Sequence, residues 1–504
     1  MALQLVSLVV VLFILPLLSL LILHKLSNKE SAINKKLNLP PGPKKLPLIG
    51  NLHQLGSNLH RSLHDLSLQY GPLMYLQLGQ VPTVVVSSAA LAKEVFRTHD
   101  LDTSSRPYHV AWEKLSYGKA DVAFAVYGDS WRYLRKICMM ELLGPKIVGS
   151  FQLARQEEVE RTIRAIASKA SASQNGEVDL TEEIFALSTN IICRLAFGKL
   201  YQNDADNFRS MLLEAQENFM VFFFTDYLPM LGWVDVLTGK QRRLEQIFAR
   251  LDRFYQKIID EHLERNKSDP CGEDFVDVLL RLQRDEKRIN LDQIKGVLMN
   301  VFVAGTDTSA ATVEWAMTEL MRHPEVLKKA QAEVRGIVGT KGKVEEGDTD
   351  QLHYLKCIVK EAMRLHPPSP LLVPRETTSH FKLDQYDIPA KTTVLINAWT
   401  IARDPSYWPC PDEFKPERFI NEMSDPKGEE FNWIPFGEGR RICPGKNFSN
   451  KAVELMLANL LYSFDWKLPD GVTKESIDMS EGLGITVHRV IPLCLVPVVY
   501  QFDN

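Results

Sequence analysis

Phe436-Gly437-Glu438-Gly439-Arg440-Arg441-Ile442-Cys443-Pro444-Gly445 places a single cysteine in a glycine-rich loop. The glycines allow the backbone to turn tightly and to approach a large, flat ligand. Apolar residues then recur at the spacing of one helical face, which predicts that Cys443 lies just before a helix N-terminus. The dipole and free N–H groups of a helix start favour a thiolate over a thiol. Arg441 supplies a cation for an anionic group of the ligand. The alternative interpretation of the whole loop is that Cys443 is a buried structural cysteine in a glycine turn.

The pattern Phe436-x-x-Gly439-x-Arg441-x-Cys443-x-Gly445 resembles the haem-binding signature of the cytochrome P-450 haem-thiolate monooxygenases. The resemblance implies that haem b is the cofactor, with Cys443 as the iron ligand and with Phe436, Arg441 and Gly445 beside it. It also implies a mainly α fold with small β-sheets. The forms of the motifs are most similar to the plant microsomal enzymes of the seventy-one clan.

The composition is that of a large globular protein. The chain has 504 residues, a net charge of −4, 45% hydrophobic residues and 24% charged residues. The near-neutral charge argues against a nucleic-acid partner, which would need a basic face. The seven cysteines are scattered without any C-x-x-C pair, so the sequence suggests neither a disulfide framework nor a zinc site.

The first residues are apolar enough to anchor the chain in a membrane. Residues 1–23 contain no charged side chain and, as a helix, would exceed a hydrocarbon core of about 30 Å. A cleaved signal peptide is the alternative, but the basic residues follow the apolar run here instead of preceding it. We therefore expect a transmembrane anchor at 1–24, a basic and proline-rich hinge at 25–50, and a catalytic domain at 51–504. The positive-inside rule places that domain in the cytosol, and the resemblance implies the endoplasmic reticulum membrane.

Two further elements are predicted before residue 140. Residues 73–87 are rich in Val, Leu, Tyr and Thr around Gly79 and predict a hairpin. A helix is expected to start after a cap formed by Gly128-Asp129-Ser130, with Trp131 and Arg135 as neighbours on one face. An amphipathic helix with one aromatic would look the same; the resemblance implies that Trp131 and Arg135 hold a haem propionate.

Residues 291–322 predict one long helix that ends at His323-Pro324. Its centre, Ala304-Gly305-Thr306-Asp307-Thr308-Ser309, is poor helix material. The Thr308 hydroxyl can bond to the Ala304 carbonyl and bend the helix, and we expect Gly305 to give that bend room. A kink without chemistry is the alternative. The resemblance implies that Asp307 and Thr308 are the acid and alcohol that relay protons to bound dioxygen.

The remaining motifs surround the expected cofactor site. Glu361 and Arg364 lie i,i+3 on a helix that ends before Pro367, and such a pair is usually a solvated surface ion pair. The resemblance implies instead a structural charge cluster with Arg418. Residues 371–375 predict a buried strand, from which Arg375 would contact a propionate. By resemblance, the substrate pocket includes Ala304, Leu371, Leu372 and Leu483.

Residues 222–233 are unusually apolar and are interrupted by turn residues. Packing in the core explains such a stretch without any membrane. In the family that it resembles, this region lies over the substrate entrance and often dips into the membrane surface. Both interpretations remain open from the sequence.

The resemblance implies a monooxygenase that oxidises a hydrophobic small molecule, typically a terpenoid, alkaloid or phenolic. The chain contains no G-x-G-x-x-G element, so electrons must come from a partner, and the resemblance implies an NADPH-cytochrome P-450 reductase. The cationic residues Arg132, Lys136 and Lys446 are predicted to face that partner. Two alternatives remain: a haem-thiolate isomerase or dehydratase that needs no external oxygen, and a non-enzymatic haem protein.

Overall fold

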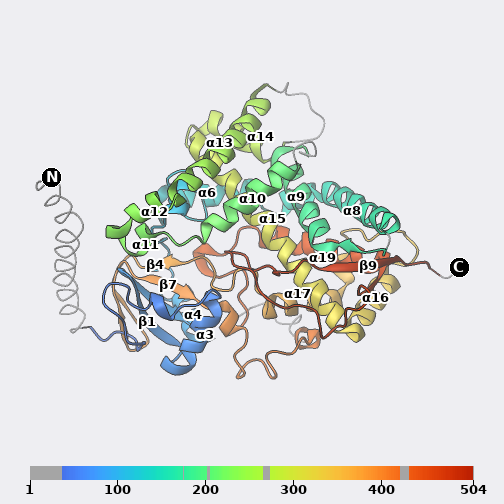
Figure 1. Cartoon of the computed structure of the whole chain (residues 1–504). Helices are drawn as coiled ribbons and strands as arrows, with labels where there is room; N and C mark the ends of the chain where they lie inside the picture. The colour runs from blue at the N-terminus through green and yellow to red at the C-terminus, as the bar shows by residue number, and fades with distance from the viewer. Residues whose placement is uncertain (1–36, 174, 201–204, 265–272, 421–430, 503–504) are drawn as a thin grey trace, which may run out of the picture.

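The computed structural model describes residues 37–173, 175–200, 205–264, 273–420 and 431–502. Helices dominate, and the small sheets gather mainly on the side that carries β1 (Figure 1), so the predicted mainly α fold is confirmed. The predicted anchor at 1–24 and residues 25–36 of the predicted hinge lie outside the described residues. Among the described helices, none is long and apolar enough to cross a membrane alone; Ser210–Tyr227 and Pro229–Leu237 meet those limits only as a pair bent by 104°.

The helices occur along the whole described part of the chain. They are α3 (Leu59–Tyr70), α4 (Ala89–Arg97), α5 (Val110–Leu115), α6 (Asp129–Ile137), α7 (Pro145–Ser150), α8 (Gln152–Ala172), α9 (Leu180–Phe197), α10 (Ala205–Phe219), α11 (Phe224–Tyr227), α12 (Trp233–Leu237), α13 (Lys240–Glu264), α14 (Phe275–Glu286), α15 (Leu291–Arg322), α16 (Pro324–Val338), α17 (His353–Leu365), α18 (Ala398–Ile401) and α19 (Lys446–Ser463). A π-helical turn at Cys138–Leu142 extends α6.

The sheets join parts of the chain that are far apart in sequence. The strands are β1 (Leu73–Leu78), β2 (Val81–Val86), β3 (Val178–Asp179), β4 (Arg375–Glu376), β5 (Phe381–Leu383), β6 (Tyr386–Ile388), β7 (Thr393–Ile396), β8 (Phe464–Lys467) and β9 (Cys494–Val499). The largest sheet has the order β1-β2-β7-β4. Its β1–β2 pair is the predicted hairpin, and β2 runs parallel to β7 with Val84 opposite Val394.

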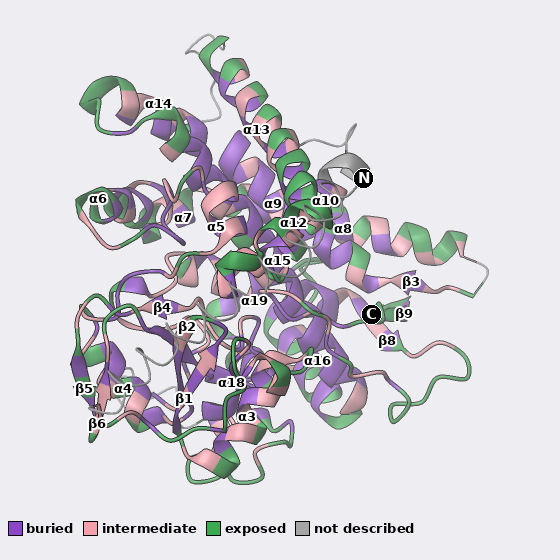
Figure 2. Ribbon diagram, turned by 60° about the vertical axis from the view of Figure 1, so that its left-hand side comes forward, coloured by how far each residue is buried: buried purple, intermediate pink, exposed green. Residues whose placement is uncertain are grey.

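Helix α15 runs through the centre of the molecule, where Figure 2 shows it surrounded by other helices and mostly buried. It begins with a capping box, in which the side chains of Asn290 and Gln293 accept from each other's backbone N–H groups. It ends at His323, as predicted, because Pro324 starts the next helix. The helix packs closely against α9: a methyl group on Gly305 would lie 2.7 Å from Ile192 Cδ1.

The expected cap of α6 is formed in part, because Gly128 is the N-cap residue. The helix already includes Asp129 and follows Gly128, and no side chain caps its first turn. The Asp129 carboxylate pairs with Arg132 instead. The predicted helix is confirmed, but Asp129 and Ser130 belong to its first turn, where an acid can bond either a backbone N–H or a nearby cation.

Glu361, Arg364 and Arg418 form one buried cluster that ties α17 to the segment before residue 420. Arg364 donates to both carboxylate oxygens of Glu361, at 2.7 and 2.9 Å, and Arg418 Nε donates to Glu361 Oε1 at 3.0 Å. Arg364 also donates to the carbonyls of Ala402 and Pro411. Neither Glu361 nor Arg364 is accessible to solvent, so these are not the surface ion pairs that the motif alone would suggest.

We expect Glu361→Ala to lower the free energy of unfolding by about 3–5 kcal/mol, because it leaves two buried guanidinium groups without their carboxylate. Denaturant titration of the full chain measures this. The control is Arg164→Ala, which removes an exposed ion pair to Glu160 and should cost about 1 kcal/mol or less. Equal losses in the two variants would contradict a structural role for the cluster.

Candidate functional site

One face of α15 is accessible although the helix is otherwise buried. Ala304 is exposed, and Val301, Gly305 and Thr308 are partly accessible, whereas nearly all other residues from 294 to 321 are buried. The spacing of four residues between Val301 and Gly305, and between Ala304 and Thr308, puts them on one stripe of the helix. This stripe is the part of α15 that can face a ligand, and it contains the predicted Ala304 and Thr308.

The central hydrogen bond predicted for α15 is present. Thr308 Oγ1 donates to the Ala304 carbonyl at 2.7 Å, while the helix continues unbroken through this turn. Gly305 has a packing role that the sequence did not predict: its missing side chain makes room for Ile192 of α9. Ser188 of α9 also donates to the Thr306 carbonyl at 2.7 Å, which fixes the two helices against each other.

Asp307, the second residue of the predicted proton relay, faces a different part of the molecule. Its carboxylate is buried and lies 2.5 Å from Nε2 of His488, in the segment before β9. Among the described hydrogen bonds, none joins Asp307 to Thr308. His488 could not be identified from the sequence, because 181 residues separate it from Asp307.

The cysteine loop has the geometry predicted from its glycines. Gly437 and Gly439 adopt positive φ angles of 64° and 73°, and Cys443 N donates to the Phe436 carbonyl at 2.9 Å. Helix α19 begins at Lys446, three residues after Cys443, as expected. Burial raises the pKa of the Cys443 thiol, although N–H groups of Gly445 and Lys446 and the charge of Arg135 act in the opposite direction. The helix start therefore does not by itself produce the predicted thiolate; a bound metal ion deprotonates a coordinating thiol.

Four arginines converge on this loop with few carboxylates to balance them. Arg135 donates to the Ile442 carbonyl, Arg375 to the Glu438 carbonyl and to Asp100, and Arg441 to the carbonyls of Ser104, Val122 and Ala125. The fourth, Arg106, was not identified from the sequence, and it donates to the carbonyls of Ala123, Val373 and Pro374.

The electrostatics of these arginines provide a test of whether an anionic cofactor fits. Burial and then the neighbouring Arg375 lower the pKa of Arg441 to about 9, and Arg135 acts in the same direction. The pKa of Arg106 is also lowered by burial, Arg441 and Arg375. Mutual repulsion between buried cations is costly unless anions compensate it. The site therefore fits a ligand with carboxylate groups, as the two propionates of haem would supply.

One of the predicted cofactor residues, Trp131, packs against this cluster, and two others lie close to the cysteine loop. The Trp131 ring lies 4.1 Å from the guanidinium carbon of Arg441, within the range of a cation–π contact. Its indole N–H donates to the Val122 carbonyl at 3.0 Å in this structure, and not to an anion. Phe436 is partly buried beside the main hydrophobic core. Gly445 stands directly before α19, and a methyl group there would lie 3.8 Å from Cys443 Sγ.

The predicted pocket residues are only partly where the sequence placed them. Residues 371–374 do not form a strand, since β4 begins at Arg375; Leu372 has a φ of 54° and its N–H bonds to Ser369 in a turn. The prediction missed this turn because the run of apolar residues masked it. The turn brings Leu372 Cδ1 within 3.7 Å of where a Gly437 side chain would begin, next to the cysteine loop. Leu371 is partly buried, and Leu483 is 69% exposed.

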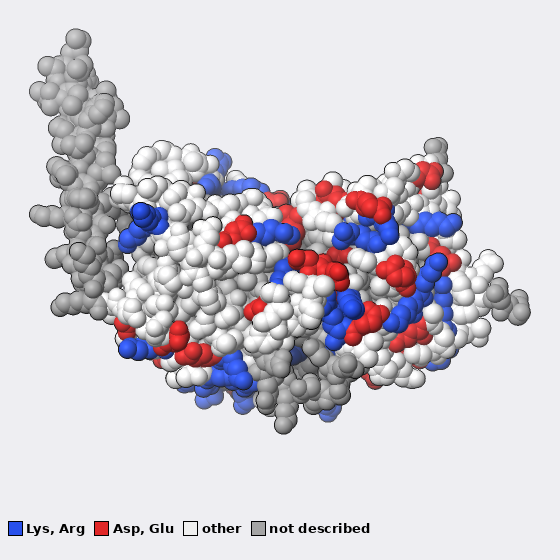
Figure 3. All heavy atoms as spheres, turned by 90° about the horizontal axis from the view of Figure 1, so that it is seen from below, with Lys and Arg blue, Asp and Glu red and all other residues white. Residues whose placement is uncertain are grey.

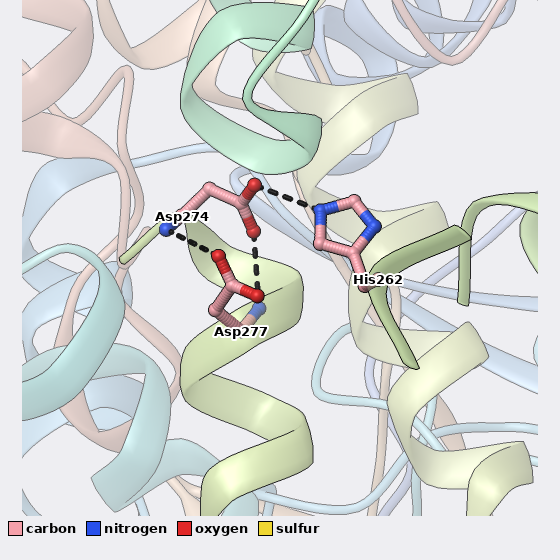
Figure 4. A group of neighbouring side chains, drawn as sticks. All are labelled: His262, Asp274 and Asp277. Carbon is pink, nitrogen blue, oxygen red and sulfur yellow. Dashed lines mark hydrogen bonds and ion pairs between the residues drawn. The ribbon is translucent and has the colours of Figure 1, made fainter. Parts of the chain in front are cut away.

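A second group of possible metal ligands is explained by local structure. His262, Asp274 and Asp277 lie close together between α13 and α14 (Figure 4). Asp274 and Asp277 form the capping box at the start of α14, and His262 bonds Asp274 at 2.8 Å and the Ile258 carbonyl at 2.7 Å. These contacts account for the cluster as a brace between two helices.

Comparisons with known proteins agree with this geometry. A family model described as "Cytochrome P450" matches residues 40–492. The chain is 50% identical over 490 residues to "Cytochrome P450 71A9" of Glycine max, covering 95% of this chain and 97% of that protein. It is 48% identical to "Strychnine-11-hydroxylase" of Strychnos nux-vomica, with 91% of each chain covered. It is 46% identical to "Phenylacetaldehyde oxime monooxygenase CYP71AN24" of Prunus mume, covering 97% and 95%.

The fold is also similar to solved structures. A zebra fish cytochrome P450 structure with abiraterone superposes with a TM-score of 0.73 at 26% identity, covering 89% of this chain and 100% of the other. A second structure of a zebra fish cytochrome P450, with progesterone, gives a TM-score of 0.74 and covers 87% and 99%.

We expect Gly305→Ala to destabilise the protein. The better helix propensity of alanine contributes about 1 kcal/mol, whereas overpacking against Ile192 costs about 1–3 kcal/mol. Ile192→Val removes the Cδ1 atom in the way, so the double variant should be more stable than Gly305→Ala, although Ile192→Val alone costs about 0.5–1.5 kcal/mol. Denaturant titration of the four proteins measures the coupling. Strictly additive effects would show that the two residues do not touch.

Proposed function

The chain belongs to the cytochrome P450 family, in its plant seventy-one clan, and is a monooxygenase acting on a small molecule; we propose that its substrate is a hydrophobic plant specialised metabolite, a terpenoid, alkaloid or phenolic. The observation that carries the proposal is the cysteine loop: Cys443 lies at the start of α19 beside buried arginines, and α15 presents an accessible threonine. The names of two relatives, a strychnine hydroxylase and an oxime monooxygenase, support this substrate class.

The family uses haem iron with dioxygen and with electrons that come from NADPH through a reductase. We propose that Cys443 is the iron ligand and that Arg135, Arg375 and Arg441, with Trp131, hold the propionates. Bound haem supplies reductive activation of dioxygen, and a thiolate ligand favours cleavage of the O–O bond. The chain itself excludes water, orients the substrate and holds the protons that the reaction consumes.

Thr308 is the group proposed to hold those protons. Its hydroxyl hydrogen points to the Ala304 carbonyl, so the oxygen lone pairs remain available to accept from water on the accessible stripe of α15. This arrangement orients a water molecule without a charged side chain in an apolar pocket. Ala304, Leu371, Leu372 and Leu483 are proposed to contact the substrate.

Two alternatives use the same cofactor differently. An isomerase or dehydratase would form product without consuming dioxygen, and a haem sensor or store would form no product. Neither needs the accessible hydroxyl of Thr308. Consumption of NADPH and dioxygen in step with product distinguishes the monooxygenase from both.

An apolar surface next to the hinge supports contact with a membrane. Trp233 is 59% exposed, and Met230, Val236 and Leu237 are exposed beside it. Gln80 N donates to the Tyr227 carbonyl at 2.7 Å, which fixes this region against the β1–β2 hairpin, and Tyr75 N donates to the hinge residue Pro41. We propose that this surface rests on the endoplasmic reticulum membrane, with residues 1–24 as the anchor and the catalytic domain in the cytosol.

Figure 3 shows a broad uncharged area on the underside of the molecule, while cations and anions are interspersed over the rest of that face.

The partner is proposed to be an NADPH-cytochrome P-450 reductase that docks near the cysteine loop. Arg135 of α6 bonds the Ile442 carbonyl, so α6 lies against this loop, and Arg132 and Lys136 are exposed on the same helix. Lys446 at the start of α19 is partly exposed. These cations can attract an acidic surface on the reductase.

We expect Thr308→Ala to retain NADPH oxidation but to lower product per NADPH by at least about tenfold, since positioned proton donors contribute about 10²–10⁴-fold. Microsomes with a reductase, tested against a panel of terpenoids, alkaloids and phenolics, provide the measurement. Thr312→Ala is the matched control, because Thr312 makes the same kind of bond to the Thr308 carbonyl but is buried one turn away. Tight coupling in Thr308→Ala would contradict the assigned role.

Reversal of charge in Arg132→Glu/Lys136→Glu should slow reductase-dependent turnover by about tenfold or more at low ionic strength, because electrostatic steering raises association rates by about 10–10³-fold. The difference should shrink as salt screens the charges. The control is Arg164→Glu/Lys343→Glu, a double reversal at exposed residues that both pair with Glu160. Equal rates in both double variants at low salt would rule out α6 as the docking surface.

A further inference from the structure

The segment that carries His488 is held in place from two sides. Gly482 N donates to the His488 carbonyl at 2.7 Å, and Trp315 Nε1 of α15 donates to the Val487 carbonyl at 3.0 Å. At the base of this loop, the Glu481 carboxylate bonds His60 and Arg61 of α3. The backbone of His488 is therefore fixed relative to α15, and its side chain has little freedom to move away.

The His488 imidazole bridges two buried acids of α15. Nε2 lies 2.5 Å from Asp307 Oδ1, and Nδ1 lies 3.7 Å from Glu314 Oε2. Glu314 also accepts from Thr181 of α9 at 2.6 Å, so its position is fixed independently of His488. The charged groups that face the imidazole are thus Asp307 and Glu314; Arg489, beside it in the chain, donates to Thr318 and lies near Glu314.

This arrangement makes His488 a cation. Asp307 and Glu314 outweigh the effect of burial and raise the pKa of His488 to about 10. Two carboxylates that are each 2% exposed would repel one another without a cation between them. The side chain of His488 is itself 29% exposed, so water reaches the imidazole but not the carboxylate behind it.

We propose that His488 is a positioning residue that holds the Asp307 carboxylate on the side of α15 away from the Thr308 hydroxyl, and thereby sets how efficiently dioxygen reduction is coupled to product. This rests on the monooxygenase function proposed above. With His488 in place, the acid next to Thr308 is fixed at His488, and proton supply to Thr308 is independent of pH around neutrality. Without the imidazole, the Asp307 carboxylate loses its partner in the segment before β9 and becomes free to turn.

The first test needs no turnover. The pKa of His488 is raised on folding, so the ion pair stabilises the protein fully below pH 6.5 and loses that effect as the pH rises toward about 10. The thermal midpoint of the full haem-loaded chain should therefore fall more steeply between pH 7 and pH 10 in wild type than in His488→Gln. Identical slopes would show that the ion pair does not exist.

The second test measures coupling. In His488→Gln, product per NADPH should fall by about tenfold, since displacing a catalytic group by about 1 Å can cost about 100-fold, and it should vary between pH 6 and 8. His488→Lys restores the cation and should restore a flat pH profile. His366→Gln is the matched control: it removes another histidine–acid pair on α15, to Glu319 at 2.7 Å, and should leave coupling unchanged.

The outcomes separate this role from the proposed function. Wild-type protein that forms no product from dioxygen would overturn the monooxygenase proposal itself. Coupled wild-type turnover together with a His488→Gln variant whose coupling and pH profile match those of His366→Gln would overturn only the positioning role of His488.

Discussion

Buried positive charge around the cysteine loop is the constraint on which the rest of the site depends. Four guanidinium groups lie among backbone carbonyls here, those of Arg106, Arg135, Arg375 and Arg441. The acids whose charges partly compensate them are Asp100 and Asp121. Burial raises the pKa of Asp121 to about 6, so this carboxyl group is harder to ionise than an exposed one, although it is still mostly ionised at pH 7. Such a cluster is stable when an anionic ligand completes it, which links folding of this region to occupancy by the cofactor.

Helix α15 connects that constraint to the chemistry. One face presents Ala304 and Thr308. Another carries three buried acids: Asp307 and Glu314 face His488, and Glu319 bonds His366. The helix thus keeps its buried, paired acids on one side and its accessible alcohol on the other. The close packing of Gly305 on Ile192 keeps both faces in register with the rest of the molecule.

Local patterns in the sequence predicted the local structure well. The hairpin at 73–87, the helix at 291–322 and the bond from Thr308 to Ala304 depend on neighbouring residues, and all three were found. Contacts were missed where distant segments decide the outcome. Gly305 packs against Ile192 of another helix, and Asp307 pairs with a histidine near the end of the chain. No spacing rule within α15 encodes either contact. Arg106 was missed because a lone arginine outside any motif carries no signal until the fold surrounds it.

The parallel pairing of β2 with β7 also has a consequence for biosynthesis. Val84 and Val394 are neighbours in the sheet, so the ribosome must deliver most of the polypeptide before the hydrogen-bonding edge of β2 finds its partner. Closing so long a loop is entropically slow, and an unpaired apolar strand invites aggregation meanwhile. Nascent chains of this protein would thus benefit from chaperones that shield the first hairpin until translation has passed residue 396.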